Sequence, residues 1–227
     1  MKEFLYFPYD YFKNKIRGKN TIRQTLKPLF EILPSSPVLL EAGAFNGADT
    51  LSMHYAWPNA TIYAFEPVTE SFALLKKRTR FIKNVNIYNM ALGDRTGTST
   101  INVSQGKSAA SSSLLEPKDH ITSYPDVEFE SSLEIKTITL NDWAKQYAVS
   151  KVDFMWLDMQ GFELFALKAG NEVLQNVKAI YMEVSIIELY KGSPLYDEVR
   201  EWMASKGFKV LLEELNETDG NVLFVRA

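Results

Sequence analysis

The feature that most constrains the fold is a strand, a glycine-containing turn, a helix start and a second strand, in that order. Residues 38–42 have the pattern of a short buried strand, Gly43 and Gly47 follow them, and residues 61–65 form a second apolar run that ends at Glu66. This succession is typical of a nucleoside-binding α/β domain, in which the acid after the second strand accepts hydrogen bonds from ribose hydroxyls. We expect both glycines to let the backbone approach the ligand, because a Cβ at either position would occupy that space.

The spacing of the turn indicates which nucleoside it suits. A dinucleotide-binding turn has the pattern G-x-G-x-x-G and holds a pyrophosphate at a helix N-terminus, whereas here Glu41 opens the pattern E-x-G-x-x-x-G. A carboxylate repels a diphosphate and attracts a sulfonium or ammonium group. The turn therefore favours S-adenosylmethionine, which is cationic and has no phosphate, over NAD. A structural or sugar-phosphate-binding crossover is one alternative, and a dehydrogenase is the least favoured one.

Composition argues against several other classes of protein. The formal net charge of −3 disfavours a nucleic-acid partner, because such partners usually bind a basic face. The chain has no cysteine, which excludes a cysteine nucleophile, zinc–thiolate sites and disulfides. No signal sequence is recognisable, and no apolar run approaches the roughly 18 residues of a transmembrane span. We expect a cytoplasmic enzyme without a transmembrane segment.

Later segments continue the alternation of strands and helices. Apolar runs of strand length occupy residues 85–88, 152–157 and 179–182, and two further strands, at 208–212 and 221–225, end the chain. Successive right-handed βαβ units produce a parallel sheet, and a terminal hairpin adds one antiparallel strand. We predict an α/β, Rossmann-like class I methyltransferase fold: a seven-stranded, mostly parallel sheet with a C-terminal antiparallel strand and helices on both faces.

Two of the expected helices have readable starts. One spans residues 163–174, after the turn that contains Gly161. Ser193 is expected to cap the last helix, with Pro194 at its first position, because serine and proline favour these two positions. Its end is expected at Gly207.

We expect a small N-terminal unit and one larger domain. Residues 1–35 would form a helical cap and residues 36–227 the methyltransferase domain, with a polar insertion at 104–127 between an edge strand at 98–103 and its partner within 130–138. Aromatic side chains crowd the start of the chain: Phe4, Tyr6, Phe7, Tyr9, Tyr11 and Phe12. The alternatives to a simple cap are a contact that makes a homo-oligomer, a substrate lid and a membrane-surface anchor.

Several motifs follow one another along most of the chain. They are 41–47 with Thr50, 65–67, 89–94 with Gly97, 111–114, 137–142, 152–154, 157–163 and 182–183. In this order they resemble the FkbM family of S-adenosylmethionine-dependent methyltransferases, which implies O-methylation of hydroxyls on sugars and other natural products. Two positions depart from the family pattern, since Trp156 replaces a lysine and Gln160 a glutamate. The pair of changes keeps the local charge sum, as a swapped ion pair would, or else marks a changed acceptor site.

Three residues are candidates for the proton transfer that a hydroxyl acceptor requires. Asp158 is the first, because it follows a central strand at the sheet edge where α/β proteins bind ligands. Glu183 follows the next strand and could share that role, and His120 in the polar insertion is the third. Glu163 could cap its helix or face the acceptor. The carboxylates would suit Mg²⁺ or Ca²⁺, but one acid pair does not support a divalent metal, and no metal ligand is assigned.

The cofactor is expected to be held by residues from the same motifs. Phe45 and Asn46 would line its methionine and ribose side, residues 89–91 the adenine, and Ser112 either acceptor hydroxyls or the methionine end. The full expected set is Glu41, Gly43, Phe45, Asn46, Gly47, Glu66, Pro67, Asn89, Met90, Ala91, Ser112 and Asp158.

The sequence thus predicts an S-adenosylmethionine-dependent O-methyltransferase that acts on a hydroxyl, most plausibly of a sugar or glycan. The acceptor would be a small molecule or a glycan. Two alternatives stay open: a non-catalytic module that binds the cofactor, and an N- or carboxyl-methyltransferase acting on a protein or small molecule.

Overall fold

The structure is a computed structural model that describes residues 27–106 and 110–227. The aromatic start, and with it most of the expected cap and the homo-oligomer contact, lies outside the described residues. The last residues of the expected cap form one short helix, α3 (Leu29–Ile32), whose Leu29 is buried.

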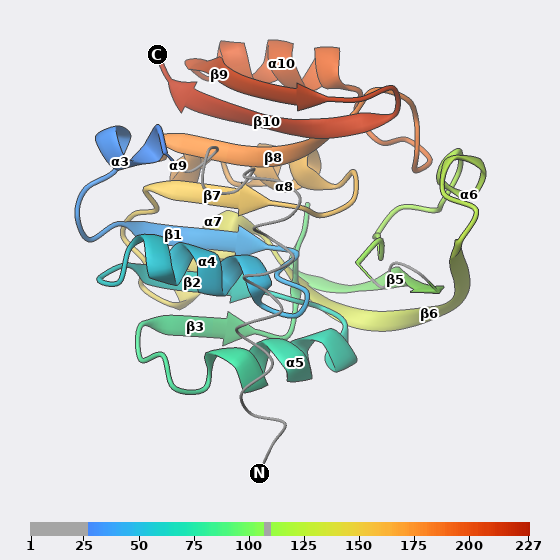
Figure 1. Cartoon of the computed structure of the whole chain (residues 1–227), viewed down its shortest axis with the longest axis horizontal. Helices are drawn as coiled ribbons and strands as arrows, with labels where there is room; N and C mark the ends of the chain where they lie inside the picture. The colour runs from blue at the N-terminus through green and yellow to red at the C-terminus, as the bar shows by residue number, and fades with distance from the viewer. Residues whose placement is uncertain (1–26, 107–109) are drawn as a thin grey trace.

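The central sheet has seven strands in the order β3-β2-β1-β7-β8-β10-β9 (Figure 1). They are β1 (Val38–Ala42), β2 (Thr61–Phe65), β3 (Val85–Tyr88), β7 (Phe154–Leu157), β8 (Ala179–Ser185), β9 (Phe208–Leu215) and β10 (Asp219–Arg226). The pairs among β3, β2, β1, β7 and β8 are parallel, and β10 runs antiparallel to both β8 and β9. The predicted mostly parallel sheet with a C-terminal antiparallel strand is confirmed.

Helices cover both faces of this sheet, as predicted (Figure 1). They are α4 (Ala48–Ala56), α5 (Thr69–Thr79), α7 (Leu140–Gln146), α8 (Glu163–Ala169), α9 (Asn171–Leu174) and α10 (Tyr196–Ser205). Met53 of α4 packs with Leu39 and Phe154 on one face, whereas Leu164 of α8 packs with Leu40 on the other. Neighbouring residues of one strand point to opposite faces, which places Leu39 and Leu40 in two separate cores.

Two helices differ from expectation for local reasons. The helix expected over 163–174 is divided at Gly170, where a Cβ would lie 2.5 Å from Leu140 Cδ1, so close packing with α7 requires glycine there. The last helix begins at Tyr196 and not at Pro194. Leu195 is still extended because it forms a β-bridge with Ser185, so the helix starts only after it.

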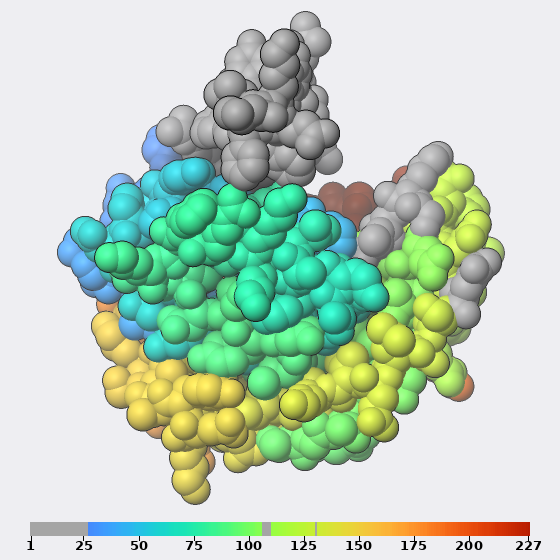
Figure 2. Space-filling model, turned by 90° about the horizontal axis from the view of Figure 1, so that it is seen from below, coloured from blue at the N-terminus to red at the C-terminus, as the bar shows by residue number. Residues whose placement is uncertain are grey.

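A second sheet, which carries the expected edge strand and its partner, stands beside the first. Its order is β4-β6-β5, with β4 (Ala91–Leu92), β5 (Gly97–Gly106) and β6 (Val127–Ile138). The predicted pairing of 98–103 with 130–138 is confirmed, since β5 and β6 are antiparallel over a longer stretch. Between them lies α6 (His120–Ser123). In the space-filling view the green and yellow hairpin extends beside the cyan side of the molecule (Figure 2).

Candidate functional site

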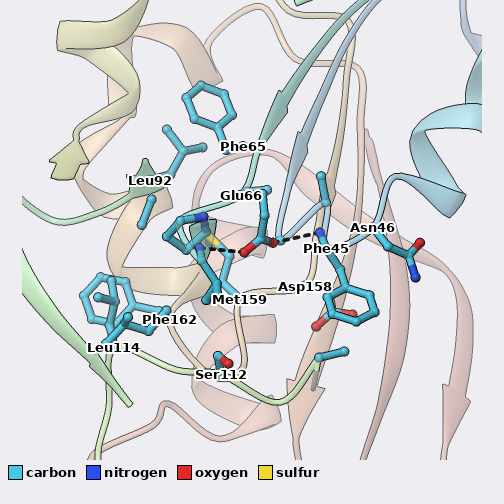
Figure 3. A pocket seen from close by; sticks show the side chains of 18 of the residues that line it. Phe45, Asn46, Phe65, Glu66, Leu92, Ser112, Leu114, Asp158, Met159 and Phe162 are labelled. Carbon is cyan, nitrogen blue, oxygen red and sulfur yellow. Dashed lines mark hydrogen bonds between the residues drawn. The ribbon is translucent and has the colours of Figure 1, made fainter. Parts of the chain in front are cut away.

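A cleft opens at the carboxyl ends of β1, β2 and β7, where the second sheet and residues 110–114 cover it. Of the predicted site residues, the following line it: Gly43, Phe45, Asn46, Glu66, Pro67, Ala91, Ser112 and Asp158. The remaining predicted residues are not in the lining: Glu41, Gly47, Asn89, Met90, His120 and Glu183. Figure 3 shows Glu66 in the middle, with Phe45 and Asn46 on one side and Leu114 and Phe162 on the other.

Glu66 is fixed in the cleft by main-chain groups. The amide of Phe45 donates to its Oε2 and the amide of Val68 to its Oε1, each at 2.8 Å (Figure 3). Burial raises the pKa of Glu66 to about 7, against the lowering effect of these two amides. A carboxylate has about four acceptor positions, so two amides leave capacity for further donors. Glu66 can therefore bind a ligand with a pair of hydroxyls.

Asn89 supports this turn from outside the cleft. Its Nδ2 donates to the carbonyl oxygens of Glu66 and Pro67, both at 3.0 Å. The neighbouring Met90 is half-buried and packs against the main core. Of the three residues expected around the adenine, only Ala91 therefore lines the cleft.

The two glycines of the first turn are required by packing within the protein. A Cβ on Gly43 would lie 1.8 Å from the carbonyl oxygen of Asp158, and one on Gly47 would lie 2.7 Å from Leu75 Cδ1. Both residues have positive φ, +83° and +78°. The glycines allow the turn to pack against the β7–α8 loop and against α5. The expectation that they also let the backbone approach a ligand stays a prediction.

Glu41 faces away from the cleft, although the sequence placed it beside the cationic end of the cofactor. Its carboxylate is buried and accepts a hydrogen bond from the Thr50 hydroxyl of α4. Burial, with Asp49 nearby, raises its pKa well above the ordinary value. Asp49 itself lines the cleft, which sequence reasoning missed. The negative charge in the cleft comes from Asp49, Glu66 and Asp158.

Asp158 and Glu183 form an acid pair joined by one amide. Gln160 Nε2 donates to Asp158 Oδ1 at 2.7 Å and to Glu183 Oε2 at 2.8 Å. Burial raises the pKa of Asp158 to about 6, and the hydrogen bond from Gln160 opposes this rise. Burial and the nearby Asp158 and Glu163 raise the pKa of Glu183 well above its ordinary value. Glu183 lies inside β8 and not at its end, because the strand continues to Ser185.

Glu163 contacts the loop that precedes its own helix. It is buried at the start of α8, and the amide of Met159 donates to its Oε1 at 2.6 Å. The pKa of Glu163 is raised to about 8, and burial is the largest cause of this shift. The contact with Met159 holds the loop before α8 and is not a helix cap, because Phe162 is the N-cap of α8 and makes no side-chain capping hydrogen bond. Glu163 is also outside the lining of the cleft.

Trp156 and Gln160, the two departures from the family pattern, have separate surroundings. Trp156 packs on Tyr181 in the core, with ring centroids 4.4 Å apart. Gln160 lies at the sheet edge, where its Oε1 accepts from the Tyr190 hydroxyl at 2.8 Å. The two side chains therefore have different partners in this chain. Tyr190 was not identified from the sequence, because it follows β8 in a loop without a motif.

His120 is not placed for the expected catalytic role. Its ring is buried among aromatic side chains, with centroids 5.2 Å from both Phe129 and Tyr190. Among the residues that the structure describes, none is a hydrogen-bond partner of its Nδ1, and burial lowers its pKa. The histidine is outside the lining because α6 packs onto the loop after β8, where the amide of His120 donates to the Leu189 carbonyl.

Among residues 27–106 and 110–227, no three or more His, Cys, Asp or Glu side chains are grouped to hold a metal ion. Within the same part of the chain, none of the helices has the length and apolarity needed to span a bilayer.

Two relatives of this chain are named as methyltransferases. The 2-O-methyltransferase NoeI of Sinorhizobium fredii (strain NBRC 101917 / NGR234) is 28% identical over 192 residues, which cover 82% of this chain and 78% of the relative. The methyltransferase sdnD of Sordaria araneosa is 22% identical over 204 residues, covering 78% of this chain and 76% of the relative.

Solved structures share the fold at low sequence identity. The N-terminal domain of EvdMO1 with S-adenosylhomocysteine (SAH) bound has a TM-score of 0.52 and 12% identity, covering 92% of this chain and 82% of that one. An rRNA methylase from Streptococcus thermophilus has a TM-score of 0.52 and 13% identity, covering 92% and 97%. The family description "Methyltransferase FkbM domain" matches residues 41–210, most of the sequence. The chain belongs to the FkbM methyltransferase family.

Proposed function

We propose that this S-adenosylmethionine-dependent methyltransferase transfers its methyl group to a hydroxyl, and that the acceptor is a sugar or glycan. Family membership carries methyl transfer and the cofactor. The hydroxyl acceptor is supported by one observation above all, the position of Asp158 in the cleft beside Gln160 and Glu183. The name of the relative NoeI, a 2-O-methyltransferase, agrees with it.

The cleft fits the cofactor in charge and in hydrogen bonding. When bound, S-adenosylmethionine supplies a methyl group activated by a positively charged sulfur. The acidic lining, from Asp49, Glu66 and Asp158, suits a cationic ligand. Glu66 would accept from the ribose hydroxyls, and Ala91 with Leu92 would offer an apolar wall to the adenine.

Asp158 would act as the general base. An alcohol is a weak acid and a weak nucleophile, so a positioned carboxylate that takes its proton accelerates the reaction by about 10²–10⁴-fold. Burial raises the pKa of Asp158 to about 6, which makes it a stronger base than an exposed aspartate while leaving it largely ionised at neutral pH. The backbone carbonyl of Asp158 packs against Gly43, so the base lies next to the cofactor turn.

An acceptor screen tests this proposal. The full chain would be incubated with methyl-labelled S-adenosylmethionine and a panel of mono- and oligosaccharides, and the product would be analysed by NMR for an O-methyl group. We expect label on a sugar oxygen, and loss of that label in Asp158→Asn. Label on nitrogen or on a carboxylate would contradict the hydroxyl acceptor. SAH binding without turnover on any acceptor would favour a non-catalytic module.

A further inference from the structure

Both the nitrogen and the oxygen of the Gln160 side-chain amide form hydrogen bonds next to Asp158 and Glu183. Its Nε2 has two N–H groups, and one reaches Asp158 Oδ1 while the other reaches Glu183 Oε2. Its Oε1 accepts from the Tyr190 hydroxyl at 2.8 Å. Asp158 follows β7, Glu183 lies in β8 and Tyr190 follows β8, so one side chain joins three segments of the sheet edge.

The main chain of Gln160 is held as well. Its φ is +55°, a left-handed conformation that is uncommon for residues other than glycine. Such a conformation persists only where the surroundings over-determine it. Here Ser113 Oγ donates to the Gln160 carbonyl oxygen at 2.8 Å, and the Tyr190 hydroxyl also contacts the Ser111 carbonyl oxygen at 2.8 Å. Residues 110–114 cover the cleft. The covering segment is therefore bonded to Gln160 directly through Ser113, and it meets Gln160 again at Tyr190, whose single hydroxyl proton is shared between the Ser111 carbonyl oxygen and Gln160 Oε1.

The electrostatics of the site explain why a neutral donor matters there. In the described part of the chain, no lysine, arginine or histidine forms an ion pair with Asp158, Glu163 or Glu183. Further carboxyl groups face the pair from Asp49 of α4, Glu163 of α8 and Asp219 of β10, and Tyr190 faces it from its loop. Two carboxylates at close range without a cation do not both ionise readily. An amide that donates to each of them stabilises negative charge without adding any.

We propose that Gln160 is a positioning residue, which holds the acid pair in one arrangement and, through Tyr190 and Ser113, ties the base to the segment that covers the cleft. The role of Asp158 as base rests on the proposed function. The geometry of the tie does not depend on which acceptor is methylated. Gln160 is outside the cleft lining, so it acts through Asp158 and makes no contact with the cofactor.

Carboxyl titration by ¹³C NMR of the full chain, labelled at aspartate and glutamate side chains, tests the tie directly. Asp158→Asn and Glu183→Gln assign the two signals. In Gln160→Met, which has similar volume and no donor, we expect the titration midpoint of Asp158 to rise by about one to two pH units, since a hydrogen bond to a charged group contributes about 1.5–3 kcal/mol and one pH unit corresponds to about 1.4 kcal/mol. Tyr190→Phe should raise it less. Tyr196→Phe, which removes a hydroxyl that donates to Glu213 elsewhere, is the matched control and should leave it unchanged.

A second variant keeps the test valid if Gln160→Met does not fold. Gln160→Asn suits a positive φ and keeps an amide, but it is one methylene too short to bridge the pair, so the midpoint should rise in the same direction. SAH affinity, measured by calorimetry, should be unchanged in all Gln160 variants. Unshifted midpoints in both folded variants would overturn the positioning role. A shifted midpoint in a protein that methylates nitrogen would keep the tie and reject only the hydroxyl acceptor.

Discussion

The two sides of the cleft are built from different kinds of groups. On the side where we propose that the cofactor binds, Glu66 is held by backbone amides of Phe45 and Val68, and the turn beneath it by Asn89. On the proposed acceptor side, Gln160 and Tyr190 hold the acid pair through side-chain contacts. Backbone donors are present whatever the residue, whereas side-chain donors vanish with one substitution. The acceptor side is therefore the side at which related chains can diverge without loss of the cofactor site.

Gly43→Ala should have the largest effect, because Gly43 packs against the backbone of Asp158 and so connects the two sides of the cleft. The new Cβ would lie 1.8 Å from the Asp158 carbonyl oxygen, at a φ of +83°. We expect destabilisation by more than about 3 kcal/mol, measured by chemical denaturation. Gly192→Ala is the matched control, since Gly192 has a φ of +77° and nothing within 4 Å of a Cβ. Equal losses in both variants would mean that only the backbone conformation matters.

Asp158→Asn should lower turnover and leave cofactor binding nearly unchanged, which would separate the functions of the two sides. Loss of the base is expected to lower kcat by about 10²–10⁴-fold, with SAH affinity within a few-fold of wild type. Asp153, at the opposite end of β7, bonds the amide of Val38 and pairs with Lys151 and Lys178. Asp153→Asn should lower stability and leave the turnover of the folded protein unchanged. A nearly intact rate in Asp158→Asn would show that the acceptor needs no strong base.

Glu66→Ala should have the reverse effect on the cofactor side. Loss of hydrogen bonds to the ribose is expected to weaken SAH binding by about 10–100-fold, since each hydrogen bond to a charged group contributes about 1.5–3 kcal/mol. Because the pKa of Glu66 is about 7 and the ionised form is the better acceptor, SAH affinity should fall as the pH drops below 7. Glu66→Gln should lose that pH dependence. Undiminished affinity in Glu66→Ala, by calorimetry, would remove Glu66 from the site.

Glu163→Gln should have the smallest effect. It measures how much the buried Glu163 carboxyl contributes to the pH dependence of stability. The pKa of Glu163 is raised from 4.5 to about 8, so the folded state holds a proton that the unfolded state releases between these values. Stability should therefore fall as the pH rises from about 5 to 8. The variant should reduce this fall by about 1–2 kcal/mol in thermal melts at several pH values. Glu198→Gln on the exposed side of α10 should leave it unchanged.

The sequence predicted the cofactor side better than the acceptor side. The strand–turn–helix–strand unit, the place of Glu66 and a mostly parallel sheet with an antiparallel C-terminal strand follow from local patterns, and the structure has them. The orientation of Glu41 could not be foreseen, because it depends on Thr50 one helical turn into α4. Nothing local distinguishes a residue that lines the cleft from one that supports it, as Asn89 does.

On the acceptor side, partners far apart in the chain decide the outcome. His120 had the right chemistry for a base, but the docking of α6 on the loop after β8 buries its ring among aromatic side chains. Gln160 was noticed as a departure, yet its role depends on Tyr190, 30 positions later. A single sequence does not reveal such pairs.

The β5–β6 hairpin is attached to the rest of the protein near both of its ends. Near one end, Ala91 and Leu92 of β4 pair with Thr137 and Ile138 of β6, and beyond the other the Pro117 bridge to Tyr190 joins the loop after β8 (Figure 1). Between these two attachments, Ile101 of β5 lines the cleft. If the acceptor enters there, as we propose, changes of side chain in the hairpin would alter acceptor choice while the central sheet stays as it is.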